Sequence, residues 1–96
     1  MATYRVLFWK TIPSLVEAQE GDRTARVQLS QRFQDLIDAV AMRVGASASE
    51  AYLEGWEQGP ITDRPGSAES VAQAVAAELE ASFEEVLRKT LLTPAP

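Results

Sequence analysis

Residues 4–13, YRVLFWKTIP, carry more aromatic and aliphatic bulk than any other ten residues of the chain. Side chains alternate between the two faces of a β-strand, so a strand at about residues 3–10 divides this bulk into two sets. One set is Tyr4, Val6 and Phe8, and the other is Arg5, Leu7 and Trp9. Since only one face of a small sheet faces the core, Leu7 and Trp9 need cover from the chain's own elements, from a partner chain or from a ligand.

Two more strands follow the first. The triplet at residues 11–13 ends the first strand, because proline cannot donate to a β-ladder. A second strand is expected at about 14–19, and the sequence EGDR at 20–23 indicates a hairpin tip. A third strand is expected at about 24–29, where alternate residues face the core and the others face out. The inward set is Ala25, Val27 and Leu29, and the outward set is Thr24, Arg26 and Gln28.

The sequence SQRFQDLIDAVAMRVG at residues 30–45 predicts an amphipathic helix. Its apolar residues recur at the spacing of one helical face. They are Phe33, Leu36, Ile37, Val40, Ala41 and Val44. Ser30 is placed as the N-cap, and Gly45 is placed to end the helix.

The remaining residues predict two more helices separated by a loop. A short helix begins at Ser47 or Ser49 and carries Tyr52, Leu53 and Trp56 as its bulky residues. Residues 57–67 are rich in turn formers and have room for a short fourth strand at 57–62. A single long helix is expected from residue 68 to about residue 91, capped by Ser67 or, in an alternative register, by Ser70. The fold class is therefore α+β: a small antiparallel sheet of three to four strands in the order β-β-β-α-α-(β)-α, with helices on one face.

Composition bounds the function. The 96 residues indicate one domain, residues 1–92, with a frayed tail at 93–96. The chain has no cysteine and no histidine, so thiolate and imidazole chemistry are excluded and no cofactor or metal is predicted. The net charge is −5, from a balance of +1 in residues 1–48 and −6 in residues 49–96. An acidic chain without a basic run, an apolar span or a signal pattern is expected to be cytoplasmic, without nucleic-acid or membrane partners.

Several polar and aromatic groups have both a structural and a functional interpretation. Asp35 and Asp38 lie three residues apart on the predicted helix, where a solvated face is the simpler explanation than paired carboxylate chemistry. The glutamates at 78, 80, 84 and 85 are interpreted as a solvated negative face. The aromatic residues Trp9, Tyr52 and Trp56 belong either to the core or to an interface.

Four stretches together resemble a known family. They are FWKTIPSLVEAQ, VQLSQRFQDLIDAVAMRVG, SEAYLEGW and GSAESVAQAVAAELE, which cover nearly the whole chain. They are similar to the small bacterial family described as virulence factor, or conserved virulence factor domain. The resemblance implies no catalytic residues. It does imply an accessory role beside corrinoid and tetrahydrofolate methyl-transfer proteins of one-carbon metabolism.

The leading prediction is a non-catalytic accessory protein that binds a protein partner or its own copy. Its predicted interaction surface combines one side of the first strand with a helix face. The surface residues are Arg5, Leu7, Trp9, Lys10, Arg32, Asp38, Arg43 and Trp56. A second hypothesis is a small-molecule-binding or catalytic subunit with Arg32, Asp35, Asp38 and Arg43 as polar groups and Trp9 or Trp56 stacked on a ring. A third is a structural homodimer without a ligand.

Overall fold

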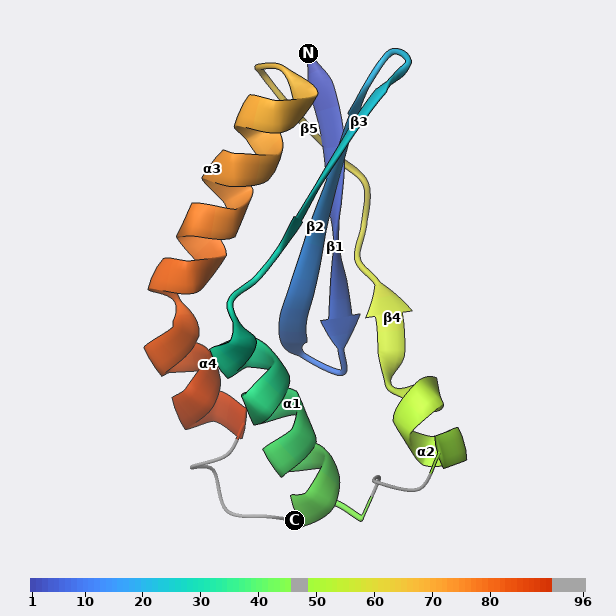
Figure 1. The fold of residues 1–96 in the computed structure, drawn as a ribbon, viewed down its shortest axis with the longest axis vertical. Helices are drawn as coiled ribbons and strands as arrows, with labels where there is room; N and C mark the ends of the chain where they lie inside the picture. The colour runs from blue at the N-terminus through green and yellow to red at the C-terminus, as the bar shows by residue number, and fades with distance from the viewer. Residues whose placement is uncertain (46–48, 91–96) are drawn as a thin grey trace.

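A computed structural model describes residues 1–45 and 49–90. Within these residues the chain forms five strands and four helices, which confirms the predicted α+β class (Figure 1). The elements are β1 (Ala2–Trp9), β2 (Ile12–Glu20), β3 (Arg23–Gln28), α1 (Gln31–Arg43), α2 (Ser49–Glu54), β4 (Trp56–Gln58), β5 (Thr62–Arg64), α3 (Ala68–Ala81) and α4 (Phe83–Thr90). The alternative helix start at Ser47 and the predicted tail at 93–96 lie outside the described residues.

The sheet is an antiparallel meander with two short strands added. Its order is β3-β2-β1-β4, and β5 also pairs with β1. The β2–β3 hairpin turns at Gly21, whose φ of 58° suits a residue without a Cβ. The β1–β2 connection is tighter than predicted, because the strands end at Trp9 and restart at Ile12. Pro13 therefore lies inside β2, where a break in register between Leu7 and Phe8 accommodates it.

The segment predicted as a possible single strand at 57–62 forms two strands that follow β1 at opposite ends. β4 pairs with Leu7–Trp9, and β5 pairs with Ala2–Tyr4. Between them Gly59 donates its N–H to the carbonyl of Val6 at 2.8 Å. Pro60 follows and has no N–H to continue the ladder. The loop is thus fixed to β1 at Gly59, but regular pairing is interrupted there.

The first helix confirms the periodicity argument. Of its predicted apolar face, all residues but Val44 are buried, and Val44 is 50% exposed just after the helix ends. Ser30 occupies the N-cap position, yet its side chain makes no cap hydrogen bond to the helix. The C-terminal helix differs more, because the single helix predicted to about residue 91 is two helices that meet at Ser82. The Ser82 hydroxyl donates to the carbonyl of Leu79 at 2.7 Å, a local bond that competes with helix continuation.

The helix break has a packing consequence. Beyond Ser82 the ring of Phe83 meets the ring of Phe33 edge-on at 5.0 Å between centroids, which joins α4 to α1. At the other end of α3, Ser67 and Ser70 form a reciprocal capping box, so the two serines predicted as alternatives act together.

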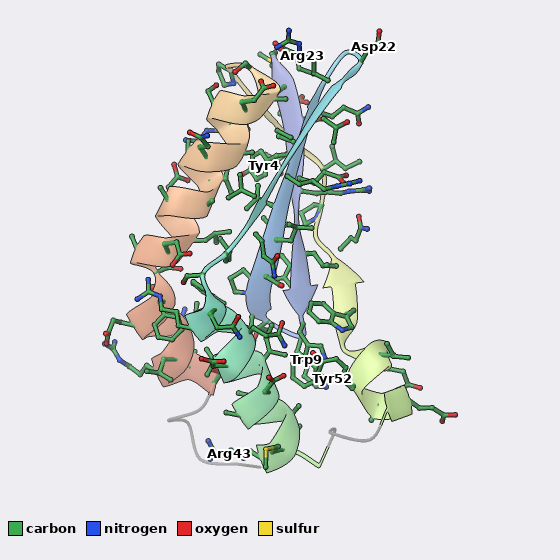
Figure 2. The ribbon with its side chains drawn as sticks, in the orientation of Figure 1. Tyr4, Trp9, Asp22, Arg23, Arg43 and Tyr52 are labelled. Atoms are coloured by element: carbon green, nitrogen blue, oxygen red, sulfur yellow. The ribbon has the colours of Figure 1, made fainter. Side chains whose placement is uncertain are left out.

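One face of the sheet is covered and the other is not. Helix α3 packs against β1, β2 and β3 on the covered face, and α1 packs against β2 near its lower end in Figure 1. The core consists of Ala2, Val6, Val16, Ala18 and their partners on α1 and α3. In Figure 2 many of the polar side chains on the side of the sheet away from α3 extend into solvent. None of the described helices is long and apolar enough to cross a membrane.

Trp9 corrects the simple alternation of faces. The sequence pattern placed it beside Leu7 on the uncovered side, but its side chain is 0% exposed. Helix α2 stacks the ring of Tyr52 on Trp9 at 5.8 Å between ring centroids, and the indole Nε1 donates to the carbonyl of Tyr52 at 2.7 Å (Figure 2). Gly55 lies so close that a Cβ there would be 2.5 Å from Cε2 of the indole. Trp9 is therefore covered by the chain's own elements and needs neither a partner chain nor a ligand for its burial.

Candidate functional site

The uncovered side of the sheet, which we call the open face, is built from three cross-strand rows. The hairpin register aligns one residue from each of β1, β2 and β3 in every row. The rows are Thr3–Gln19–Thr24, Arg5–Glu17–Arg26 and Leu7–Leu15–Gln28. The middle row is fully charged and the row beside it begins with two leucines. The open face therefore combines apolar contact area with directional charged groups.

The charged row is held together by ion pairs. Arg26 Nε donates to one Glu17 oxygen at 2.8 Å, and Arg5 Nη2 donates to the other at 3.3 Å. The hydrogen bond from Arg26 is the largest influence on the pKa of Glu17, and with the second arginine it outweighs desolvation and lowers that pKa. Two guanidinium groups on one carboxylate leave a net charge of +1. The arginine side chains remain 40% and 66% exposed, so both are accessible to a partner's carboxylates.

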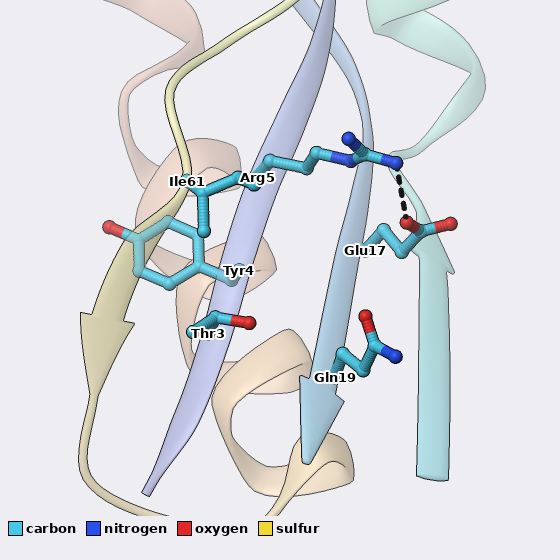
Figure 3. A pocket seen from close by; sticks show the side chains of 6 residues that line it. All are labelled: Thr3, Tyr4, Arg5, Glu17, Gln19 and Ile61. Carbon is cyan, nitrogen blue, oxygen red and sulfur yellow. Dashed lines mark hydrogen bonds and ion pairs between the residues drawn. The ribbon is translucent and has the colours of Figure 1, made fainter. Parts of the chain in front are cut away.

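Apolar residues flank this row. Leu7 and Leu15 lie half-buried beside Gln58 of β4, and Ile61 is 68% exposed next to Tyr4 and Arg5 (Figure 3). The face is hollowed only slightly, with one depression of about 90 Å³ and another of about 40 Å³. Pockets for small ligands usually enclose several hundred Å³. The open face is therefore shallow, which suits contact with another protein surface better than enclosure of a small ligand.

The structure does not bring the predicted interaction surface together. Arg5 and Leu7 lie on the open face, but Trp9 is in the core and is a wrong assignment to a contact surface. Trp56 is half-buried in β4, with its ring edge-on to Tyr52 at 6.0 Å. Lys10 is exposed in the β1–β2 turn, where its φ is 54°. The residues predicted to form one surface along the first strand therefore lie in three places: the open face, the core and the end of the sheet.

The predicted helix residues belong to other contacts. Arg32 binds Glu80 of α3 at 3.0 Å, and Asp38 accepts a hydrogen bond from Gln34 one turn earlier at 3.0 Å. Arg43 lies in the last turn of α1, at the far end from the sheet in Figure 2. The contacts of Arg32 and Asp38 thus lie among the helices, and Arg43 lies apart from both at the end of α1.

The polar set of the small-molecule hypothesis also fails to converge. Asp35 accepts from Gln31 at 3.1 Å, and with Arg32 it borders a wide apolar groove between α1 and α4 that excludes Asp38 and Arg43. Within residues 1–45 and 49–90, no group of three or more carboxylates is placed to hold a metal ion.

The residues that sequence reasoning missed are those that β-pairing and the β4–β5 loop bring to Arg5 and Leu7. They are Leu15, Glu17, Arg26, Gln58 and Ile61. Alternation did place Arg26 on the outward side of its strand. The missing step was the register: a hairpin closed by the Glu20–Arg23 pair sets Glu17 opposite Arg26. The position of the turn therefore determines that Glu17 and Arg26 face each other in the charged row.

Fold and site together define a small α+β domain with one helix-covered sheet face and one open, mixed polar and apolar face. The chain belongs to the virulence factor family, whose sequence profile matches residues 7–91. This confirms the family resemblance found in the sequence. Searches among curated proteins and among solved structures found no match.

Proposed function

We propose that this chain is a non-catalytic protein-interaction domain that binds a partner through the open face of its sheet. The observation that carries this proposal is the placement of Leu7, Leu15 and Ile61 around the Arg5–Glu17–Arg26 row on the one sheet face that the helices leave uncovered. Protein interfaces typically combine an apolar centre with arginine-rich polar surroundings. The slight relief of the face favours a protein surface as the ligand over a small molecule.

The net charge of the row favours a partner with carboxylate groups. Arg5 and Arg26 each have donors beyond those used by Glu17, so a facing aspartate or glutamate completes their hydrogen bonds. The charged rows of two copies docked face to face would instead set four arginines against two glutamates, with the Asp63 of each copy one row away. Charge therefore favours a different protein over a homodimer built on this face.

The family resemblance suggests where to look for the partner. We propose a bacterial cytoplasmic accessory role, with corrinoid- or tetrahydrofolate-linked methyl-transfer proteins as the first class of partner to test. This part of the proposal rests on the resemblance alone. The open face supports an interaction role whichever process the partner serves.

Site-specific photo-crosslinking tests the proposal. Gln19 is exposed on the open face, and Ala77 is exposed on α3 on the other side of the molecule, so a photoreactive residue is introduced at each position in turn. The Gln19 probe is expected to capture a discrete partner in native cells, whereas the Ala77 probe is not. Arg5→Glu, which changes the charge of the row from +1 to −1, is expected to abolish that capture. Equal capture from both positions, or capture insensitive to Arg5→Glu in a folded protein, would overturn the assignment.

A further inference from the structure

The outer strand of the sheet is available for pairing. β3 ends the strand order, so only one of its two edges is bonded, to β2 (Figure 1). Strand β3 contains no proline and no glycine, and its register with β2 is regular from Arg23 to Gln28. Natural edge strands are commonly blocked by prolines or bulges, because an open edge accepts further strands. Neither device is present in β3, whose edge carries only the charges of Arg23 and Arg26, and such charges deter a strand of like charge.

Alternate residues of β3 bond to β2, and this alternation identifies which backbone groups face outward. Leu29 donates its N–H to the carbonyl of Ser14 on β2 at 2.9 Å. In an antiparallel strand both backbone groups of a residue point to the same side and alternate along the chain. The groups of Val27 and Ala25 therefore point to β2 like those of Leu29. The outward groups belong to Thr24, Arg26 and Gln28, and no hydrogen bond from residues 1–45 or 49–90 reaches them.

The side chains of β3 specify the chemistry of an added strand. Arg26 is exposed on the open face, whereas Arg23 lies on the α3 side at the hairpin end, where it pairs with Glu69 at 3.8 Å. On the α3 side, Ala25 and Val27 are half-buried and pack on the core, so an apolar side chain opposite them completes their burial. Directly opposed cross-strand residues interact, and opposite charges there are stabilising. The matching strand thus alternates carboxylate and apolar residues.

We propose that β3 binds an extended acidic segment by β-strand addition, pairing with the outward groups of Thr24, Arg26 and Gln28. The inference rests on the proposed interaction function and names the kind of segment that the partner supplies. A second copy of β3 is disfavoured as the occupant, because it would bring a second Arg26 to the same face of the ladder. Like charges opposed across strands are destabilising.

A peptide titration tests the inference with defined probes. The first probe is a capped peptide as long as β3 that alternates valine and glutamate, and its matched control alternates valine and lysine. The glutamate peptide is expected to bind and to slow amide exchange at Thr24, Arg26 and Gln28. Exchange at Ala25 and Val27 is expected to change little, because β2 already protects those amides. Absence of binding, or protection without this alternation, would overturn strand addition.

Two variants separate backbone pairing from charge. Thr24→Pro removes one outward N–H while leaving the β2 ladder and both arginines intact, and proline is tolerated at such edge positions. It is expected to weaken peptide binding about tenfold, equivalent to about 1.4 kcal/mol. Arg26→Glu is expected to reverse the preference from the glutamate peptide to the lysine peptide. Unchanged affinity in Thr24→Pro, or an unchanged preference in Arg26→Glu, would contradict the proposal.

The crosslinking experiment keeps this inference distinct from the proposed function. If the Gln19 probe captures a partner whose binding survives Thr24→Pro, the open face is the interface and strand addition is wrong. If both the capture and the binding are lost in Thr24→Pro, while thermal unfolding is unchanged, the partner reaches the open face by way of β3.

Discussion

Glu80 joins the end of α3 to the start of α1, and its replacement gives the sharpest test of how this fold is stabilised. From the end of α3 its carboxylate accepts the Ser30 N–H at 2.6 Å and the Ser30 hydroxyl at 2.8 Å. It also pairs with Arg32 Nη2 at 3.0 Å. The Ser30 side chain does not cap its own helix, and Glu80 instead accepts the N–H of this N-cap residue, as a glutamate of the first turn does in a capping box. Glu80→Gln removes the negative charge but keeps one side-chain oxygen as a hydrogen-bond acceptor. Glu80→Ala removes all of these side-chain interactions.

The expected loss of stability is set by the hydrogen bonds and the ion pair that each variant removes. Loss of a helix N-cap interaction typically costs about 1 kcal/mol. The Glu80 and Arg32 side chains are 31% and 48% exposed, so their ion pair adds only about 0.5 kcal/mol after solvent screening. Loss of the second bond to Ser30 brings the expected total for Glu80→Ala to about 2 kcal/mol. Glu80→Gln keeps one neutral acceptor and is expected to cost about 1 kcal/mol.

The pH dependence gives an independent signature. Partial burial raises the pKa of Glu80, but the hydrogen bonds from Ser30 and the guanidinium of Arg32 outweigh it and lower the pKa below its usual 4.5. A carboxyl whose pKa is depressed by folding stabilises the protein above its unfolded pKa, and this contribution is lost as pH falls through the folded pKa. The stability gap between wild type and Glu80→Gln is therefore expected to be full at neutral pH and to shrink below about pH 4.5.

Urea unfolding followed by tryptophan fluorescence measures both effects. Glu84→Gln is the matched control, because Glu84 is exposed on α4 and its replacement removes the same charge. The control is expected to change stability by less than about 0.5 kcal/mol. If Glu80→Gln and Glu84→Gln are equally stable at neutral pH, or if their difference grows as pH falls, the stabilising role of Glu80 at the start of α1 is refuted.

Two further predictions concern the packing of Trp9 against the residues after α2. Trp9→Ala is expected to lower the free energy of unfolding by about 3–5 kcal/mol in urea titrations, since the side chain is 0% exposed; an unchanged midpoint would contradict its core placement. Gly55→Ala places a Cβ 2.5 Å from Cε2 of the indole and is expected to cost about 1–3 kcal/mol and to alter the near-ultraviolet circular dichroism of Trp9. Gly45→Ala, which has no atom within 4 Å of its new Cβ, is the comparison; it is expected to show only the backbone strain of its positive φ and to leave that spectrum intact.

The parts of the fold that the sequence predicts well are those set by local rules. The spacing from Phe33 to Ala41 specifies a helix and its buried face, because 3.6-residue periodicity depends only on the helix itself. The tip around Gly21 specifies the β2–β3 hairpin, since a two-residue turn fixes which residues face one another. From that register the pairing of Glu17 with Arg26 follows. Two of the three residues of the charged row are therefore predictable without knowing where Arg5 lies.

The errors arise where distant residues decide the outcome. Alternation places Trp9 beside Leu7, but burial at the end of β1 depends on Tyr52 of α2 and on Gly55 directly after it, more than 40 residues along the chain. The helix break has a similar origin. The alanine-rich segment from residue 68 favours continuation, yet at Ser82 the local hydroxyl bond and the packing of Phe83 on Phe33 favour a turn. Neither interaction is visible in the periodicity of one element.

The distribution of acidic groups explains how a chain of net charge −5 keeps a row of charge +1 on its open face, one row away from Asp63 of β5. The sequence suggested that the glutamates of the last helix form one solvated face. The structure instead commits Glu78 to a two-bond contact with Arg64, at 2.7 and 3.0 Å, and Glu80 to the start of α1. These interactions lie on the helical side of the sheet. At physiological ionic strength exposed charges farther apart than about 8 Å are largely screened from one another. A partner's carboxylates at the open face therefore respond to Arg5 and Arg26, and the chain's overall charge does not preclude an acidic ligand.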